Sequence, residues 1–277
     1  MTSALSIRRF IASAGAVAAV LLTGCAAVQT TGSGAVGIER KQYMSSLVSE
    51  QALQQEAASQ YNAMISQAKA QGALDVNAAQ TRRVQTIARR LIAQVGVFRP
   101  DAVQWNWQVH VLNSKEINAW CMPGGKIAVY SGLINSLNAT DAELAAVIGH
   151  EIAHALREHS REQVSQQMTA NIGLSVLAAV TGSQATADLG SALTDVMFTL
   201  PNSRTHEIEA DRMGVELAAR AGYDPYAAVT LWEKMSAASG GSGQPEFLST
   251  HPAASTRIAD LQKIAAQMMP LYQQSRR

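Results

Sequence analysis

The sequence predicts an α+β fold that is mostly helical and contains one small antiparallel sheet. Over most of the chain, apolar residues recur at intervals of three or four, which is typical of helices with one buried face. Residues 103–112 differ, because apolar and polar residues alternate strictly there, and this period indicates a half-buried strand. The apolar members of the alternation are Trp105, Trp107, Val109 and Val111.

Residues 1–24 are predicted to be a signal peptide that is removed from the mature protein. Arg8 and Arg9 precede an apolar run over residues 10–22, which ends at the small-residue site Thr23-Gly24-Cys25. An N-terminal membrane anchor is the alternative interpretation. The run is shorter than the roughly 20 residues that a spanning helix needs, and cleavage is therefore preferred.

The sequence Leu22-Thr23-Gly24-Cys25 resembles the lipobox of bacterial lipoproteins. The resemblance implies cleavage before Cys25 and acylation of Cys25, which anchors stably because one residue carries several acyl chains. Ala26 is not the Asp that retains lipoproteins at the inner membrane, so we expect an outer-membrane anchor facing the periplasm. The polar, glycine-containing residues 25–40 are predicted to form a lipidated tether, and residues 41–277 a single domain.

Composition narrows the possible partners. The formal net charge is +1, and no basic stripe with interleaved aromatic residues occurs, so nucleic acid is not expected as a partner. With Cys25 acylated, Cys121 is the remaining thiol, and no internal disulfide is expected. Cys121 lies between Trp120 and Met122, and we interpret it as a small buried apolar residue and not as a nucleophile.

The elements follow in order along the chain. Helical spacing predicts helices over residues 44–70 and 76–95, and the chain after residue 130 is expected to be helical. Strands are expected at residues 103–112, 117–120 and 126–130, and the last two are joined by the turn sequence Pro123-Gly124-Gly125.

One predicted helix carries the residues with the clearest chemistry. A capping box at residues 140–143 starts this helix, which continues into His150-Glu151-Ile152-Ala153-His154. Positions four apart stack on one helix face, so both imidazoles can reach one metal ion, with Glu151 beside them to act on a water. The alternative is a solvated helix with two surface histidines, and the apolar flanking residues argue against it.

A catalytic zinc ion keeps three protein ligands and one open position, so a third ligand is required. One class of zinc enzymes places a His ten residues after the first, preceded by a Gly. Those positions hold Ser160 and Arg157 here, which excludes that class. His159 is interpreted as a solvent-side histidine.

Residues 204–220 supply a candidate for the third ligand. Glu207 and Asp211 are four apart and share a helix face. Glu207 is therefore predicted to bind the metal, while Asp211 accepts the second ring N–H of a ligand histidine and fixes its orientation. Glu209 is interpreted as a surface carboxylate.

These motifs together resemble a known family. They are Asn118-Ala119-Trp120-Cys121-Met122-Pro123-Gly124-Gly125-Lys126, the stretch from Gly149 to His154, the stretch from Glu207 to Asp211, Ser249-Thr250-His251-Pro252, and Arg257. In this order they resemble the gluzincin metallopeptidases of the CAAX prenyl endopeptidase and HtpX-like family, family forty-eight of the metallo class. The soluble branch of that family includes periplasmic lipoproteins and relatives of the mitochondrial Oma-type stress protease.

The resemblance implies a zincin fold with one Zn²⁺ per chain. It implies that His150, His154 and Glu207 bind this ion and that Glu151 is the general base. It also implies an edge strand near residues 126–130 that holds an extended substrate, with contacts from Asn118, Gly125 and Lys126. Membrane-embedded members carry spanning helices, whereas the apolar stretch at residues 172–180 is too short to span, so we expect substrates outside the bilayer.

The expected function is zinc-dependent hydrolysis of peptide bonds in misfolded or unassembled envelope proteins, as a form of quality control. His251 and Arg257 are candidate donors to the oxyanion, although a surface salt bridge is the alternative for Arg257. His251 is also a candidate plug for the open zinc position, and residues 163–200 are expected to form a lid or a packed helical hairpin. The alternative function is a largely latent, chaperone-like factor in outer-membrane protein assembly. An esterase or amidase acting on cell-wall material fits the zinc but not the strand-binding groove that the resemblance implies.

Overall fold

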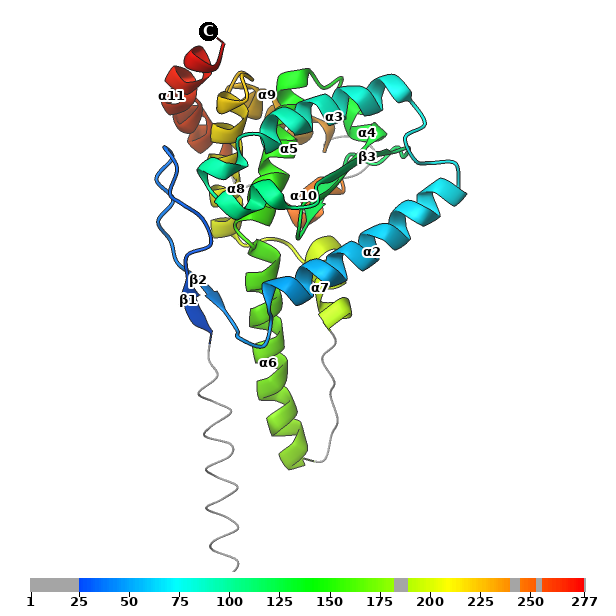
Figure 1. Ribbon diagram of the computed structural model, residues 1–277, viewed down its shortest axis with the longest axis vertical. Helices are drawn as coiled ribbons and strands as arrows, with labels where there is room; N and C mark the ends of the chain where they lie inside the picture. Colours follow the sequence, from blue (N-terminus) through cyan, green and yellow to red (C-terminus); the bar gives the residue numbers. More distant parts are fainter. Residues whose placement is uncertain (1–24, 182–188, 240–244, 253–255, 277) are drawn as a thin grey trace, which may run out of the picture.

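The computed structural model describes residues 25–181, 189–239, 245–252 and 256–276, with side chains described outside residues 171–181 (Figure 1). The mostly helical α+β fold is confirmed. The main helices are α2 (Glu50–Ala70), α3 (Ala78–Ile92), α4 (Ser131–Ser136), α5 (Asp141–Leu156), α6 (His159–Thr181), α7 (Leu189–Phe198), α8 (Arg204–Arg220), α9 (Ala227–Ala238), α10 (Phe247–Thr250) and α11 (Arg257–Ser275). Two 3-10 helices are η1 (Val95–Val97) and η2 (Pro100–Gln104). The strands are β1 (Ala26–Val28), β2 (Gln42–Met44), β3 (Gln108–Leu112), β4 (Ala119–Met122) and β5 (Lys126–Tyr130).

The three-stranded sheet is mixed, and the prediction of a purely antiparallel sheet is wrong. Its strand order is β3-β5-β4, with β3 parallel to β5 and β4 antiparallel to β5. The turn at Gly124 and Gly125, both with positive φ, folds β5 back beside β4. β5 then lies between β4 and β3, and it runs parallel to β3. Because β5 is paired on both sides, residues 126–130 cannot be the predicted substrate-binding edge, and β4 is an edge of this sheet.

β3 begins later than its sequence pattern suggested. Pro100 starts the 3-10 helix η2, which takes residues 100–104 out of the strand. The alternation before Gln108 has another cause, since Trp105 and Trp107 stack on each other at 5.5 Å between ring centroids.

Residues 25–40, predicted to be a tether, pack against the domain instead. Val36 and Ile38 belong to the main hydrophobic core, and the Val36 amide donates to Glu216 at 2.9 Å. β1, at the start of this segment, pairs antiparallel with β2, which lies just after its end. We call residues 26–44 the N-terminal strap. Its polar, glycine-containing composition gave no sign of these contacts, because each contact is made with residues far away in the sequence.

Helices α5 and α8 cross at the centre of the molecule (Figure 1). The predicted capping box is confirmed, because the Thr140 side chain accepts from the Glu143 amide at 3.2 Å and Glu143 accepts from the Thr140 amide at 2.8 Å. α5 is buried on all sides from Glu143 to Leu156, so its histidines do not lie on a solvated surface. Two glycines, Gly149 on α5 and Gly214 on α8, lie at the crossing.

Residues 163–200 contain two helices that pack together, α6 and α7. This agrees with the predicted helical pair, while residues 182–188 between them lie outside the described residues. Figure 1 shows α6 projecting from the body of the molecule. Residues 172–180 form part of its outer half. No helix in the described part of the chain combines the length and apolarity needed to cross a membrane.

The glycine contact between α5 and α8 generates a testable prediction. A Cβ atom at Gly214 would lie 2.7 Å from the backbone nitrogen of His150, so Gly214→Ala must push the two helices apart. We expect the free energy of unfolding to fall by about 1–3 kcal/mol, as in other overpacked cores. Thermal or urea unfolding measures the change.

Gly32→Ala is the matched control, because its added Cβ would meet atoms no closer than 3.6 Å. Equal stabilities for the Gly214→Ala and Gly32→Ala proteins would contradict the importance of this crossing.

Candidate metal centre

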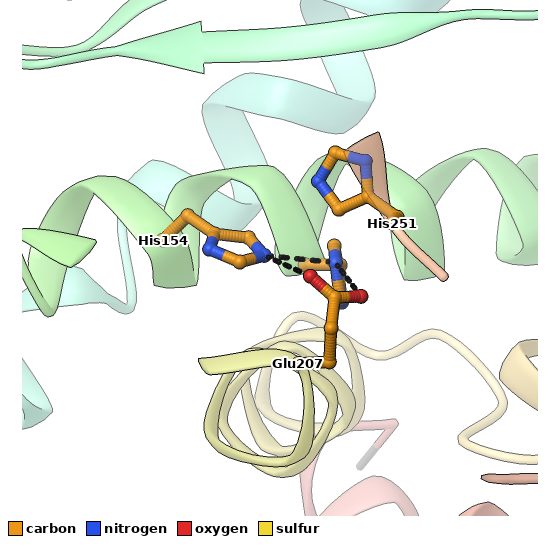
Figure 2. A group of neighbouring side chains, drawn as sticks. His154, Glu207 and His251 are labelled. Carbon is orange, nitrogen blue, oxygen red and sulfur yellow. Dashed lines mark hydrogen bonds and ion pairs between the residues drawn. The ribbon is translucent and has the colours of Figure 1, made fainter. Parts of the chain in front are cut away.

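Four buried side chains converge at one point in the interior. His150 and His154 come from α5, Glu207 from the first turn of α8, and His251 from the residue that ends α10. One possible ligand atom from each lies within 4.8 Å of the others. Figure 2 shows His154, Glu207 and His251 approaching one another from these three elements.

The distances within this cluster suit a metal ion. His154 Nε2 lies 3.0 Å from His150 Nε2 and 3.3 Å from Glu207 Oε1, and His150 Nε2 lies 3.6 Å from Glu207 Oε2. Glu207 Oε1 is buried and has no hydrogen-bond partner among the described residues. Two imidazole nitrogens and a carboxylate oxygen that face one another in this way form a donor set suited to a divalent ion such as zinc.

The tautomer of His150 follows from its other partner. His150 Nδ1 lies 2.9 Å from Asp211 Oδ1, and a carboxylate can only accept, so the proton is on Nδ1. His150 Nε2 then directs its lone pair at the cluster. This is the geometry that the spacing of Glu207 and Asp211 predicted.

Arg257 lies behind the cluster, where it bridges the two carboxylates of α8. Its guanidinium donates to Glu207 Oε2 at 2.6 Å and to Asp211 Oδ1 at 2.7 Å, and it stacks over the Trp232 ring at 3.4 Å. Arg257 is buried, so the surface salt bridge considered from the sequence is wrong. Both terminal nitrogens are already committed to carboxylates. This contact does not match the expected donation to an oxyanion, and it suits a residue that positions Glu207 and Asp211.

Charge and burial set the protonation of the cluster. Burial lowers the pKa of His154 and that of His251 well below their ordinary value, so both imidazoles are neutral, which is the form that binds metal ions. Burial alone would raise the pKa of Glu207, but this pKa is lowered, since the permanent positive charge of Arg257 and its hydrogen bond to Glu207 Oε2 stabilise the anion. Glu207 is therefore an anion.

Glu151 occupies a different environment from Glu207. Burial raises the pKa of Glu151 well above its ordinary value, and the charge of Glu207 adds to the rise, against an opposing backbone hydrogen bond from Cys121. Glu151 Oε1 has no hydrogen-bond partner in the described part of the chain, and it lies 3.4 Å from His251 Nε2. A carboxylate with a raised pKa and a free oxygen beside a metal site can accept a proton from water near neutral pH.

A cavity of about 250 Å³ opens beside the cluster. Residues at the edge strand β4, at the end of α7 and around the cluster line it, among them Asn118, Trp120, Phe198, Glu151 and His251. α7 therefore forms one wall of this cleft. Arg257 is not among the lining residues.

Of the three residues expected to contact substrate, Asn118 lines the cleft and two do not. The Lys126 side chain is buried and donates to the backbone carbonyls of Asn106 and Gly124. Gly125 lies against Trp107, since a Cβ there would approach the indole to 2.5 Å. Through these contacts both residues stabilise the β4–β5 turn. They are not available to a substrate strand, because β5 is the central strand of the sheet.

Two residues near the cluster were interpreted incorrectly from the sequence. His159 and Glu209 are both buried, and His159 Nε2 lies 3.0 Å from Glu209 Oε2. The helical wheel of α5 does not apply to His159, because Glu158 adopts a positive φ of 52° and α6 starts afresh at His159. Cys121 is buried, as predicted, and burial raises the pKa of its thiol well above the ordinary value.

Comparison with known proteins identifies the family. Residues 78–265 match the sequence profile of Peptidase family M48. The chain belongs to this family. The match includes the α5 motif and the α8 motif, and it confirms the resemblance inferred from the order of the motifs.

Relatives of known name support the same assignment. The chain is 41% identical to mitochondrial metalloendopeptidase OMA1 of Arabidopsis thaliana over 55% of this chain and 30% of the relative. It is 38% identical to metalloendopeptidase OMA1 of Bos taurus over 62% of this chain and 35% of the relative. It is 30% identical to the beta-barrel assembly-enhancing protease of Escherichia coli (strain K12) over 70% of this chain and 41% of the relative. The matched region therefore spans less than half the length of each of these relatives.

Proposed function

We propose that this M48 protein is a zinc-dependent endopeptidase that cleaves extended segments of other proteins. The observation that supports this most directly is the buried group of His150, His154 and Glu207, with Glu151 beside it at a cleft bordered by a strand edge. Zinc bound there would polarise a peptide carbonyl and make water acidic enough to attack it near neutral pH.

The chain's own residues perform the remaining steps. Glu151 accepts the proton of the attacking water and returns it to the leaving amine, for which its raised pKa is suitable. β4 pairs with β5 on one side, and its other edge can bind a substrate segment as an added strand. If His251 acts as a donor to the oxyanion, it does so from Nε2, which lies 3.4 Å from Glu151 Oε1 beside the cleft.

Strand addition favours unfolded segments, since a folded protein rarely offers an extended backbone to a strand edge. Misfolded or unassembled envelope proteins are substrates of this kind. The relative named as a beta-barrel assembly-enhancing protease supports an envelope setting. The chain is anchored to the outer membrane by acyl chains on Cys25, and it faces the periplasm.

A largely latent factor in outer-membrane protein assembly is the second candidate, and one observation favours it. His251 Nδ1 lies 3.1 Å from the Phe247 carbonyl and 2.9 Å from the Thr250 hydroxyl. In the tautomer that donates from Nδ1 to the Phe247 carbonyl, Nε2 keeps its lone pair for a metal ion. His251 can therefore serve as a fourth ligand in the position that a catalytic site keeps open. In that state the site would hold zinc and cleave little.

The first test separates an enzyme from a binding factor. Wild-type protein should contain about one zinc per chain, from the ligand count, and should cleave casein. Glu151→Gln should keep the zinc and lose cleavage, while Glu207→Ala should lose both. Elemental analysis and a casein assay measure the two quantities. Full zinc content in the Glu207→Ala protein would exclude Glu207 as a ligand.

The second test concerns latency. If His251 is the fourth ligand of a latent site, His251→Ala should raise the basal rate of casein cleavage, because it frees the fourth position while zinc stays bound. The opposite result, a large loss of cleavage with unchanged zinc content, would assign His251 a purely catalytic role.

The third test concerns anchoring. Cys25→Ser should move the protein from the membrane fraction to the soluble fraction, because acylation of Cys25 provides the attachment. Fractionation followed by immunoblotting measures the distribution. If the variant stays on membranes after a high-salt wash, acylation of Cys25 is not what holds it there.

A further inference from the structure

We propose that the N-terminal strap is part of the support of the metal centre, through a chain of hydrogen bonds from Arg40 over Glu209 and His159 to His154. This inference rests on the proposed metal site. In this proposal His159, Glu209 and Arg40 position the ligand His154, a role that their places in the sequence do not indicate.

The inner end of this series of hydrogen bonds is the proposed ligand His154. His154 Nδ1 lies 2.9 Å from His159 Nδ1, and His159 Nε2 lies 3.0 Å from Glu209 Oε2. A carboxylate only accepts, so His159 carries its proton on Nε2 and its Nδ1 is an acceptor. His154 must then donate from its own Nδ1. This leaves the lone pair of His154 Nε2 pointing at the cluster, as metal binding requires.

The outer end of this series of hydrogen bonds is Arg40, in the N-terminal strap. Arg40 Nε donates to Glu209 Oε1 at 2.7 Å, and the two terminal nitrogens of Arg40 donate to the two oxygens of Glu162 at 2.8 Å. Arg157 donates from Nε and Nη2 to Glu209 Oε2, at 3.1 and 2.9 Å. Arg157 also bonds to the strap itself, since its Nη2 donates to the Arg40 carbonyl at 3.0 Å.

A second branch holds the ring of His159 in place. His206 stacks on His159 with 4.3 Å between centroids and 9° between the planes, and His206 Nε2 lies 3.0 Å from Glu162 Oε2. Glu162 is also the carboxylate that accepts two hydrogen bonds from Arg40. The strap thus acts on His159 from two sides, through Glu209 at its edge and through Glu162 and His206 at its face.

Burial makes this arrangement sensitive to Arg40. The side chains of Glu162, Glu209 and Arg157 are 2%, 7% and 0% exposed, whereas that of Arg40 is 31% exposed and covers them from solvent. The carboxylates of Glu162 and Glu209 lie against the guanidinium groups of Arg40 and Arg157. Without Arg40, one buried carboxylate loses its bidentate partner, and buried charges that lose a partner rearrange or take up water. Glu209 is then less firmly held against His159.

The experiment measures zinc affinity in the full-length protein by chelator competition, together with unfolding temperatures of the zinc-free and zinc-loaded forms. His159→Leu should weaken zinc binding by about 10–100-fold, the usual effect of losing the partner of a ligand histidine. Arg40→Gln, two hydrogen bonds further out, should weaken it by about tenfold, at the low end of that range. Both should reduce the zinc-induced rise in unfolding temperature.

Glu216→Gln is the matched control. Glu216 is a buried carboxylate of α8 that also binds the strap, through the Val36 amide, but it has no bond to the chain that reaches His154. Its zinc affinity should stay within about twofold of the wild type. Arg40→Lys, which keeps the charge but not the bidentate geometry, should fall between wild type and Arg40→Gln, and it serves if Arg40→Gln fails to fold.

Equal zinc affinity in the Arg40→Gln and Glu216→Gln proteins would overturn the proposal, because the strap would then act only through general packing. The measurement needs no substrate. A wild type that binds zinc but cleaves no casein would therefore refute the proposed endopeptidase and leave this inference standing.

Discussion

The close approach of α5 and α8 is the constraint on which the site depends. A Cβ atom on Gly149 would lie 2.9 Å from the Gly214 carbonyl oxygen, so the two backbones are almost in contact. Only at this separation can Glu207 reach both histidines of α5. One turn further along α8, the same separation lets Asp211 meet the far nitrogen of the His150 ring. A glycine pair therefore sets the distances that a metal ion would require.

Each proposed histidine ligand is backed by its own set of buried charges. Behind His150 lie Asp211 and Arg257, and behind His154 lie His159, Glu209 and the two arginines that hold it. A single buried charge without a partner costs several kcal/mol, which explains why each carboxylate in these sets is paired with a guanidinium group. The cluster lies between two ionic networks, and each fixes one imidazole ring.

The sequence predicted what depends on local spacing and missed what depends on distant pairing. His150, Glu151 and His154 lie on one helix, and Glu207 and Asp211 on another, so helical geometry placed each group correctly. The prediction that His159 faces solvent was wrong, because Glu158 has a positive φ and a new helix begins at His159. The central position of β5 and the packing of the strap could not be predicted, since both depend on which distant segment lies alongside.

The packing of the strap also determines how freely the enzyme could move at a membrane. A flexible linker of fifteen residues would allow a range of about 20 Å, whereas Ala26, directly after Cys25, already belongs to strand β1. If acyl chains on Cys25 hold the protein as proposed, the catalytic body could move only a short distance from the lipid surface. The cleft could then reach only proteins in the layer of periplasm next to the bilayer, and proteins beyond that layer would be too far away to be cleaved.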